Sequence, residues 1–264
     1  MIMFQLTREV RFAINDGVDD LQARPTNGFG GFPTLRGLGR YFELRVMLAG
    51  ALDPQSGYLC NIRQIDSVVR ERAIPMMRQS LDGRRSTGET MVALWASELA
   101  DAWPGAKLVR LSLRLSPFLS VDAALSELPM IQLSQKFEFS AAHRLHHPAL
   151  SAEENLRLYG KCNNPHGHGH NYEVKVTLRG EPDENGRLID LVRFERLVRQ
   201  NVIEKFDHKH LNVEVEEFIN LIPTVENIAK VVYQLLRPAF AGKGAQLSSV
   251  TVWETPKTWC EYSE

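Results

Sequence analysis

Apolar and polar residues alternate in two stretches of the second half of the chain, and this spacing of two indicates β-strands with one buried face. The alternating apolar residues are Ile131, Leu133, Phe137 and Phe139 in the first stretch and Tyr172, Val174, Val176 and Leu178 in the second. Apolar positions at helical spacing follow in residues 191–202 and 228–236, the latter behind Pro223 and Thr224, which suit a helix start. Adjacent strands followed by a pair of helices predict an antiparallel α+β unit.

The same pattern occurs once before, in the first half of the chain. The aligned segments are residues 40–50 with 170–180, residues 87–91 with 224–228, and residues 108–117 with 247–256. Because the order of the segments is kept, we infer a tandem repeat of two diverged copies. We expect residues 1–116 and 131–264 to form the copies, joined by a linker at residues 117–130. Each copy is expected to pack two helices on one face of an antiparallel four-stranded sheet, so that a further copy must cover the other face.

Composition and charge narrow the classes of partner. The chain has 264 residues, of which 44% are hydrophobic and 24% charged, with a formal net charge of -1. This balance argues against nucleic acid or a membrane surface as the main partner. No apolar run approaches the roughly 18 residues of a membrane span, and the N-terminus lacks the features of a signal peptide, so we expect a cytoplasmic protein. The 3 cysteines are too far apart in sequence to suggest a disulfide framework.

The histidines are confined to one copy, because all 8 lie in the second half of the chain. His143 continues the apolar face of the first strand, whereas His168 and His170 share the face of Tyr172, since alternate side chains on a strand point the same way. Three imidazoles from neighbouring strands can converge on a catalytic Zn²⁺ and leave its fourth position open. The pair His166 and His168 has the same spacing, although continuity with the second strand favours His168 and His170.

Two further groups could move protons. Cys162 lies in a loop before the second strand, next to Lys161, where a thiol beside a metal could have a lowered pKa and act as base or nucleophile. The same thiol could instead be a fourth zinc ligand or an inert small residue. Asp207 precedes His208 after the first helix, and a carboxylate beside an imidazole can orient the ring and stabilise its cation. By itself, this dipeptide is more often a surface feature.

Two glutamates could bind a substrate. Glu254 has the same parity as Val250 and Val252 at the end of a strand, where a buried carboxylate needs a partner. Its two oxygens would suit a pair of N–H groups on a heterocycle. Glu226, at the start of a helix, could do the same or could simply interact favourably with the helix dipole.

Together these residues form a pattern that resembles the 6-pyruvoyl-tetrahydropterin synthase family, which includes the 6-carboxy-tetrahydropterin synthases. The motifs that carry the resemblance are residues 139–145, 160–172, 206–212, 224–227 and 252–255. They cover residues 131–264 in order, and the first copy shares the pattern only through the repeat. The resemblance implies tandem tunnelling-fold units whose sheets associate into a barrel, and a homo-oligomer with active sites between neighbouring subunits.

The resemblance also implies a role for each candidate residue. The family eliminates triphosphate from 7,8-dihydroneopterin triphosphate, so the implied partner is a small pterin triphosphate and the implied cofactor is Zn²⁺. Cys162 would be the proton-abstracting base, with Asp207 and His208 completing a relay, while zinc would polarise side-chain oxygens. The implied zinc ligands are His143, His168 and His170, and the implied substrate-binding residues are Glu226, Thr224 and Glu254, which would anchor the pterin ring.

Three functions remain open from the sequence. The first is formation of 6-pyruvoyl-tetrahydropterin with triphosphate elimination, and the second is 6-carboxy-5,6,7,8-tetrahydropterin synthesis from the same substrate. The interval from Cys162 to His168 resembles the pyruvoyl type, whereas the interval from Cys162 to His166 resembles the carboxy type. The third is a non-catalytic pterin- or purine-binding module with structural zinc.

The first copy lacks the chemistry of the second, which motivates the third function. The residues there are Asp16 for His143, Phe32 for Cys162, Leu38 for His168, Arg40 for His170 and Leu115 for Glu254, while Glu89 persists opposite Glu226. We therefore expect the first copy to bind no catalytic zinc and to complete the barrel.

Overall fold

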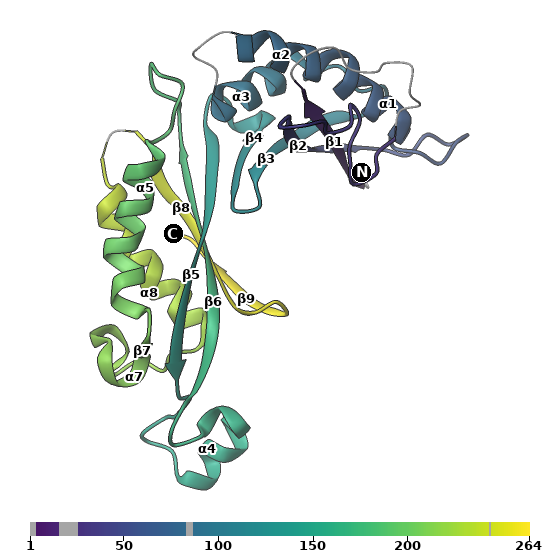
Figure 1. Ribbon diagram of the computed structural model, residues 1–264. Helices are drawn as coiled ribbons and strands as arrows, with labels where there is room; N and C mark the ends of the chain where they lie inside the picture. The colour runs from purple at the N-terminus through teal and green to yellow at the C-terminus, as the bar shows by residue number, and fades with distance from the viewer. Residues whose placement is uncertain (1–3, 16–25, 83–86, 243) are drawn as a thin grey trace. The chain divides into compact units, whose positions relative to one another are not determined.

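The computed structural model describes residues 4–15, 26–82, 87–242 and 244–264. They form two compact units: unit 1 lies within residues 1–133 and 180–188, and unit 2 comprises residues 134–179 and 189–264 (Figure 1). Among the described residues, no helix is both long and apolar enough to cross a membrane.

Unit 1 is an antiparallel sheet in the order β1-β2-β3-β4 with helices packed on it. Its strands are β1 (Phe4–Ile14), β2 (Arg40–Gly50), β3 (Lys107–Ser116) and β4 (Leu119–Ala124), followed by a short 3₁₀ turn at Leu125–Glu127. Its helical segments are α1 (Ile62–Val68), a π segment (Val69–Ala73), α2 (Ile74–Asp82) and α3 (Gly88–Glu98). The expected α+β class is confirmed for this half.

Strand β4 lies inside the segment 117–130, where the sequence pattern predicts a linker. Val121 and Ala123 are fully buried, and Val121 pairs with Leu113 of β3. The alternation here is only six residues long, which explains why it did not stand out as a strand. Unit 1 therefore extends beyond residue 116, and β4 is the fourth strand of its sheet.

Unit 2 is an antiparallel sheet in the order β5-β6-β8-β9, with the short β7 pairing in parallel with β5. Its strands are β5 (Ile131–His143), β6 (His168–Gly180), β7 (Lys209–His210), β8 (Gln246–Thr255) and β9 (Thr258–Tyr262). Its helical segments are α4 (Ala152–Tyr159), α5 (Leu191–Val198), a π segment (Arg199–Ile203), α6 (Glu204–Phe206), α7 (Leu211–Glu214) and α8 (Val225–Leu236), with 3₁₀ turns at Gly160–Asn163, Glu216–Phe218 and Arg237–Phe240.

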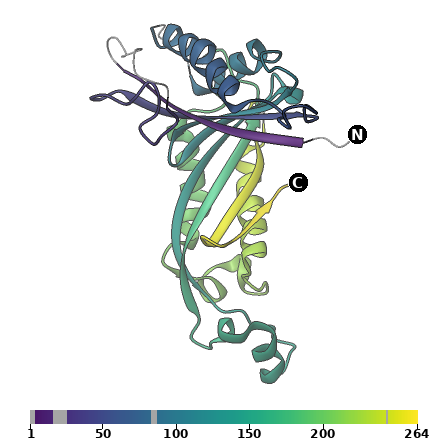
Figure 2. The ribbon, with the colours of Figure 1, turned by 90° about the vertical axis from the view of Figure 1, so that its right-hand side faces the viewer.

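The core of unit 2 lies between one sheet face and two helices, and α5 and α8 lie on that same face (Figure 1 and Figure 2). Tyr172, Val174 and Val176 of β6 are fully buried, as the alternating pattern predicts. Phe194 of α5 and Val232 of α8 are fully buried as well. Burial of one such apolar side chain contributes about 1.5–3 kcal/mol, so this interface holds the strand ends that carry the histidines.

The two units share several local features at aligned positions. The pairing of β2 with β3 has a bulge between Met47 and Leu48, and the pairing of β6 with β8 has one between Thr177 and Leu178. The helical segment that follows β2 in unit 1 and β6 in unit 2 contains a π segment, at Val69–Ala73 and Arg199–Ile203. Asparagine or aspartate caps its start, and threonine caps α3 and α8.

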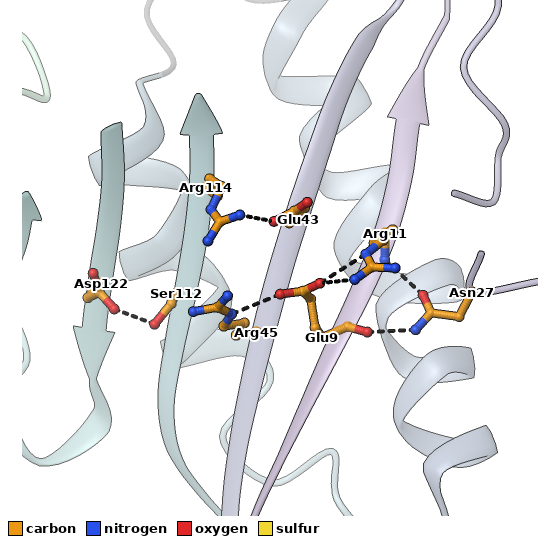
Figure 3. Close-up of polar contacts among 8 residues, drawn as sticks. All are labelled: Glu9, Arg11, Asn27, Glu43, Arg45, Ser112, Arg114 and Asp122. Atoms are coloured by element: carbon orange, nitrogen blue, oxygen red, sulfur yellow. Dashed lines mark hydrogen bonds and ion pairs between the residues drawn. The ribbon is translucent and has the colours of Figure 1, made fainter. Parts of the chain in front are cut away.

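The sheet face of unit 1 that points away from its helices carries charged rows that run across the strands (Figure 3). Glu9 of β1 accepts from Arg11 and from Arg45 of β2, at 2.7 and 2.9 Å. Glu43 of β2 accepts from Arg114 of β3 at 2.7 Å. Glu9 with Arg45 and Glu43 with Arg114 are directly opposite each other, and such cross-strand pairs stabilise a sheet by about 0.2–1 kcal/mol each.

Candidate metal centre

Three histidine side chains converge at the end of the unit 2 sheet. His143 is the last residue of β5, and His168 and His170 lie at the start of β6. Their ligand nitrogens all lie within 4.8 Å of one another, and Nε2 of His143 is 3.1 Å from Nε2 of His168. The three imidazoles therefore meet as the strand parity predicts.

The orientation of the His143 ring is fixed by contacts of Nδ1, the ring nitrogen that faces away from the other two histidines. Its Nδ1 lies 2.7 Å from the carbonyl oxygen of Pro223 and 3.3 Å from the hydroxyl of Tyr172. A carbonyl can only accept, so Nδ1 carries the hydrogen and Nε2 presents its lone pair to the other histidines. Burial is the main cause that lowers the pKa of His143 to about 4, which keeps this ring neutral and able to bind a metal.

One nitrogen that faces the cluster has no hydrogen bond. Within the described residues, the buried Nε2 of His170 neither accepts nor donates one. A buried polar atom without a partner costs about 1–3 kcal/mol, and a metal ion would remove that cost. Three imidazole nitrogens suit zinc and several other divalent ions, so the residues fit a metal of this class.

Glu254 contacts the same cluster. At the end of β8, its Oε1 lies 3.3 Å from Nε2 of His143 and 3.6 Å from Nε2 of His170. The sequence pattern placed this carboxylate at a strand end with the parity of Val250 and Val252, and β8 does end next to it, at Thr255. Its proximity to two of the histidines was not foreseen. A substrate bound to Glu254 would therefore lie beside the metal.

The structure separates the two possible histidine registers. His166 is exposed in the turn before β6, and its N–H donates to Oδ1 of Asn164 at 3.1 Å. The tight turn depends on Gly167, with φ +73°, where an added Cβ would lie 2.7 Å from Nε2 of His210. This turn brings His168 and His170, rather than His166, to His143.

The loop that carries Cys162 is tied to the chain that follows His143. The N–H of Leu145 donates to the carbonyl of Cys162 at 2.9 Å, and Nε of Arg144 donates to the carbonyl of Asn163 at 3.2 Å. Burial raises the pKa of Tyr172, and the charges of Glu254 and Cys162 raise it further. The main chain of the Cys162 loop is therefore held beside the end of β5 that carries His143.

The side chains of Asp207 and His208 contact each other, with Oδ2 of Asp207 2.9 Å from Nδ1 of His208. The N–H of Ser140 on β5 donates to Oδ1 of Asp207 at 2.9 Å, and this bond is the main cause that lowers the pKa of Asp207. His208 has φ 58°, an uncommon conformation for a residue other than glycine. An open cleft of about 520 Å³ is lined by both His208 and His170, so the exposed ring of His208 and the histidine cluster face one space.

Thr224 and Glu226 lie at the start of α8. The hydroxyl of Thr224 accepts from the N–H of Asn227 at 3.4 Å, so it caps the helix. The side chain of Glu226 is exposed. Burial raises the pKa of Cys260 on β9, and the charge of Glu226 raises it further. The structure thus brings Thr224 next to Pro223, behind the cluster, and places Glu226 toward β9.

Three residues near the cluster were missed as functional residues. Tyr172 stood out only as a core position, and Pro223 acts through its main-chain carbonyl, which carries no side-chain signal. Asn212 holds the chain next to His143, because its side chain bonds both the N–H and the carbonyl of Arg144, at 2.8 and 2.9 Å. A sequence signal existed for Tyr172 and Asn212, which fall in the motifs 160–172 and 206–212, but not for Pro223.

In unit 1, most of the side chains at the place that corresponds to the histidine cluster of unit 2 are apolar. Phe42, Leu115 and Met91 line a cavity of about 190 Å³ with Arg40. Leu115, aligned with Glu254, packs so closely that a Cβ on Gly88 would lie 2.8 Å from its Cδ1. The aligned residues Phe32 and Leu38 are half-buried and fully exposed, Glu89 is buried, and Asp16 lies outside the described residues.

Metal content offers a direct check on the difference between the units. We expect one divalent ion per chain, because all 8 histidines lie in the second half, and Leu38 and Arg40 of unit 1 align with His168 and His170. Elemental analysis of protein loaded with zinc and freed of excess would measure this ratio. Two tightly held ions per chain would contradict it.

Comparison with known proteins gives a consistent picture for the second half. The family model described as 6-pyruvoyl tetrahydropterin synthase matches residues 132–264. The 6-pyruvoyl tetrahydrobiopterin synthase of Homo sapiens is 41% identical over 125 residues, which is 47% of this chain and 85% of that protein. That of Drosophila melanogaster is 40% identical over 139 residues, 52% of this chain and 82% of that protein.

The relatives also include the carboxy type. A putative 6-carboxy-5,6,7,8-tetrahydropterin synthase of Archaeoglobus fulgidus is 35% identical over 113 residues, 43% of this chain and 88% of that protein. Among solved structures, the 6-pyruvoyl tetrahydropterin synthase of Caenorhabditis elegans is 39% identical, with a TM-score of 0.49, and the match covers 52% of this chain and 96% of that one.

Proposed function

The chain belongs to the 6-pyruvoyl tetrahydropterin synthase family, and we propose that it is a zinc-dependent lyase acting on 7,8-dihydroneopterin triphosphate. The products would be 6-pyruvoyl-tetrahydropterin and triphosphate. The observation that carries the proposal is the convergence of His143, His168 and His170 beside Glu254. The metal ligands and the pterin anchor would thereby share one site.

Each group of the site has a chemical task in this proposal. Zinc bound to the three histidines would supply Lewis-acid polarisation of oxygens on the substrate side chain. Cys162 would accept a proton from a carbon of that side chain, as the general base. His208, oriented by Asp207 at 2.9 Å, would move a proton from the cleft side. Glu254 would accept two N–H groups of the pterin ring and so hold it in place.

The assembly we propose is a homo-oligomer of tandem tunnelling-fold units whose sheets close into a barrel. The shared bulges and π segments of the two units support a tandem duplication. Edge strands β1 and β9 are each paired on one side only within the described chain, and a barrel has no such edges. Unit 1 would complete the barrel without a site of its own, because it has no histidine and Leu115 takes the place of Glu254.

The pyruvoyl product is favoured over the carboxy product by the histidine register. His168 lies in the cluster while His166 is exposed, so the interval that follows Cys162 matches the pyruvoyl type. The carboxy alternative uses the same groups on the same substrate and releases acetaldehyde as well. A binding module with structural zinc would need no Cys162 and no Asp207–His208 pair.

Incubation of zinc-loaded protein with 7,8-dihydroneopterin triphosphate separates the three functions. We expect triphosphate release together with the mass of 6-pyruvoyl-tetrahydropterin. A carboxy product together with acetaldehyde would show instead that the protein is a 6-carboxy-5,6,7,8-tetrahydropterin synthase. Saturable pterin binding without triphosphate release would overturn the lyase and leave the binding module.

A further inference from the structure

The turn that precedes α8 is built around Pro223. The N–H of Thr224 donates to the carbonyl of Ile222 at 2.8 Å, a bond between residues i+2 and i that closes a three-residue turn with proline at its centre. The fixed φ of proline, near -65°, suits this turn. Both polar groups of the peptide bond between Pro223 and Thr224 therefore have partners. Its N–H donates to Ile222, and its carbonyl accepts from His143 at 2.7 Å.

The side chain of Asn227 holds the other end of this turn. Its Nδ2 donates to the same carbonyl of Ile222 at 2.9 Å, from the first turn of α8. The N–H of Asn227 in turn donates to the Thr224 hydroxyl, which caps the helix. Asn227 therefore ties α8 to Ile222, before Pro223, and the capping bond of Thr224 ties it to the residue after Pro223. The position of α8 thereby sets the direction of the Pro223 carbonyl.

We infer that Thr224 and Asn227 are positioning residues for the metal ligand His143, acting through the Pro223 carbonyl. This deepens the proposed function, on which it rests, and gives Thr224 a task other than contact with the substrate. With Pro223 fixed, Nδ1 of His143 keeps its hydrogen and Nε2 stays free for the metal. A mobile carbonyl would let the ring turn or change tautomer and so weaken the site.

Unit 1 supplies an internal comparison. Thr90 stands at the aligned position, and its N–H donates to the Thr87 hydroxyl at 3.2 Å, as that of Asn227 does to Thr224. Its side chain differs, because the hydroxyl donates to the Thr87 carbonyl at 3.2 Å. The helix start is capped there as well, but the amide that would hold the preceding turn is absent. Unit 1 also lacks the histidine that such a turn would serve.

The test measures metal affinity, independently of turnover. Zinc and cobalt dissociation constants would be determined by competition with a chromophoric chelator for the unaltered protein, Asn227→Ala and Asn227→Asp, with the cobalt absorption spectrum of each. Both variants lose the donor to Ile222, and the Asp variant keeps the size of the side chain. We expect affinity to fall about tenfold in both, with a changed cobalt spectrum.

Matched variants separate positioning from general stability. Thr224→Ser keeps the capping hydroxyl and is expected to bind metal as the unaltered protein does, and Thr90→Ala in unit 1 likewise. Unchanged affinity and cobalt spectrum in both Asn227 variants would overturn the inference while metal binding by the unaltered protein stands. An equal loss in Thr90→Ala would also overturn it, and failure of the unaltered protein to bind either metal would remove the proposed function itself.

Discussion

His143→Ala is expected to leave the protein without tightly bound metal and to lower the rate of triphosphate release at least about 1,000-fold. The substitution removes the central ligand, which is fully buried and contacts His168 at 3.1 Å. It also leaves the Pro223 carbonyl and the Tyr172 hydroxyl facing an empty space, which costs about 1–3 kcal/mol of folding free energy per group. Metal analysis and a triphosphate assay on the purified variant measure both effects.

His166→Ala is the matched control for this experiment. His166 has the same chemistry and lies two residues from a proposed ligand, but it is exposed in a turn. Metal content and rate are expected to stay within about twofold of the unaltered protein, because exposed positions without specific contacts tolerate substitution. Loss of metal in His166→Ala, with retention in His143→Ala, would contradict the ligand set.

Cys162→Ala is expected to lower turnover by about 100- to 10,000-fold while the metal stays bound. The residue lies in the Gly160–Asn163 turn, held to Leu145 by a main-chain bond of 2.9 Å, so alanine should leave the backbone in place. Metal content, substrate affinity and single-turnover rate would be compared with those of the unaltered protein.

The buried Cys60 of unit 1 provides the control, since Cys60→Ala removes a thiol far from any histidine in the sequence. Its activity is expected to equal that of the unaltered protein. If Cys162→Ala lost its metal as well as its activity, the thiol would be a ligand rather than the base. If it kept full activity, the proton would have to leave by another route.

The strand pattern was sufficient to predict which side chains meet in unit 2. His143, His168 and Glu254 were placed by parity on the helix-facing side of their strands, and hydrophobic burial of that side brings them together. Parity is a property of each strand, so it survives errors in loop length. Both the α+β class and the histidine cluster followed from it.

Features that depend on the main chain could not be predicted in the same way. The Pro223 carbonyl approaches His143 from a segment 80 residues further along, and any residue type supplies a carbonyl. Strand β4 was missed because Val121 and Ala123 make only a short alternation. The contact between Glu254 and the two histidines depends on the register of β8 against β6, which pairs Val174 with Val252.

The π segments at Val69–Ala73 and Arg199–Ile203 bear on the history of the chain. A π segment accommodates a local insertion in a helix and is uncommon, so its presence at aligned places in both units points to a single origin. If the two units arose by duplication, the insertion that made the π segment came before the duplication. The replacement of the histidines in unit 1 came after it. The ancestor would then be a single unit that already had this helix and the histidines, and unit 1 would have lost the metal centre after the duplication.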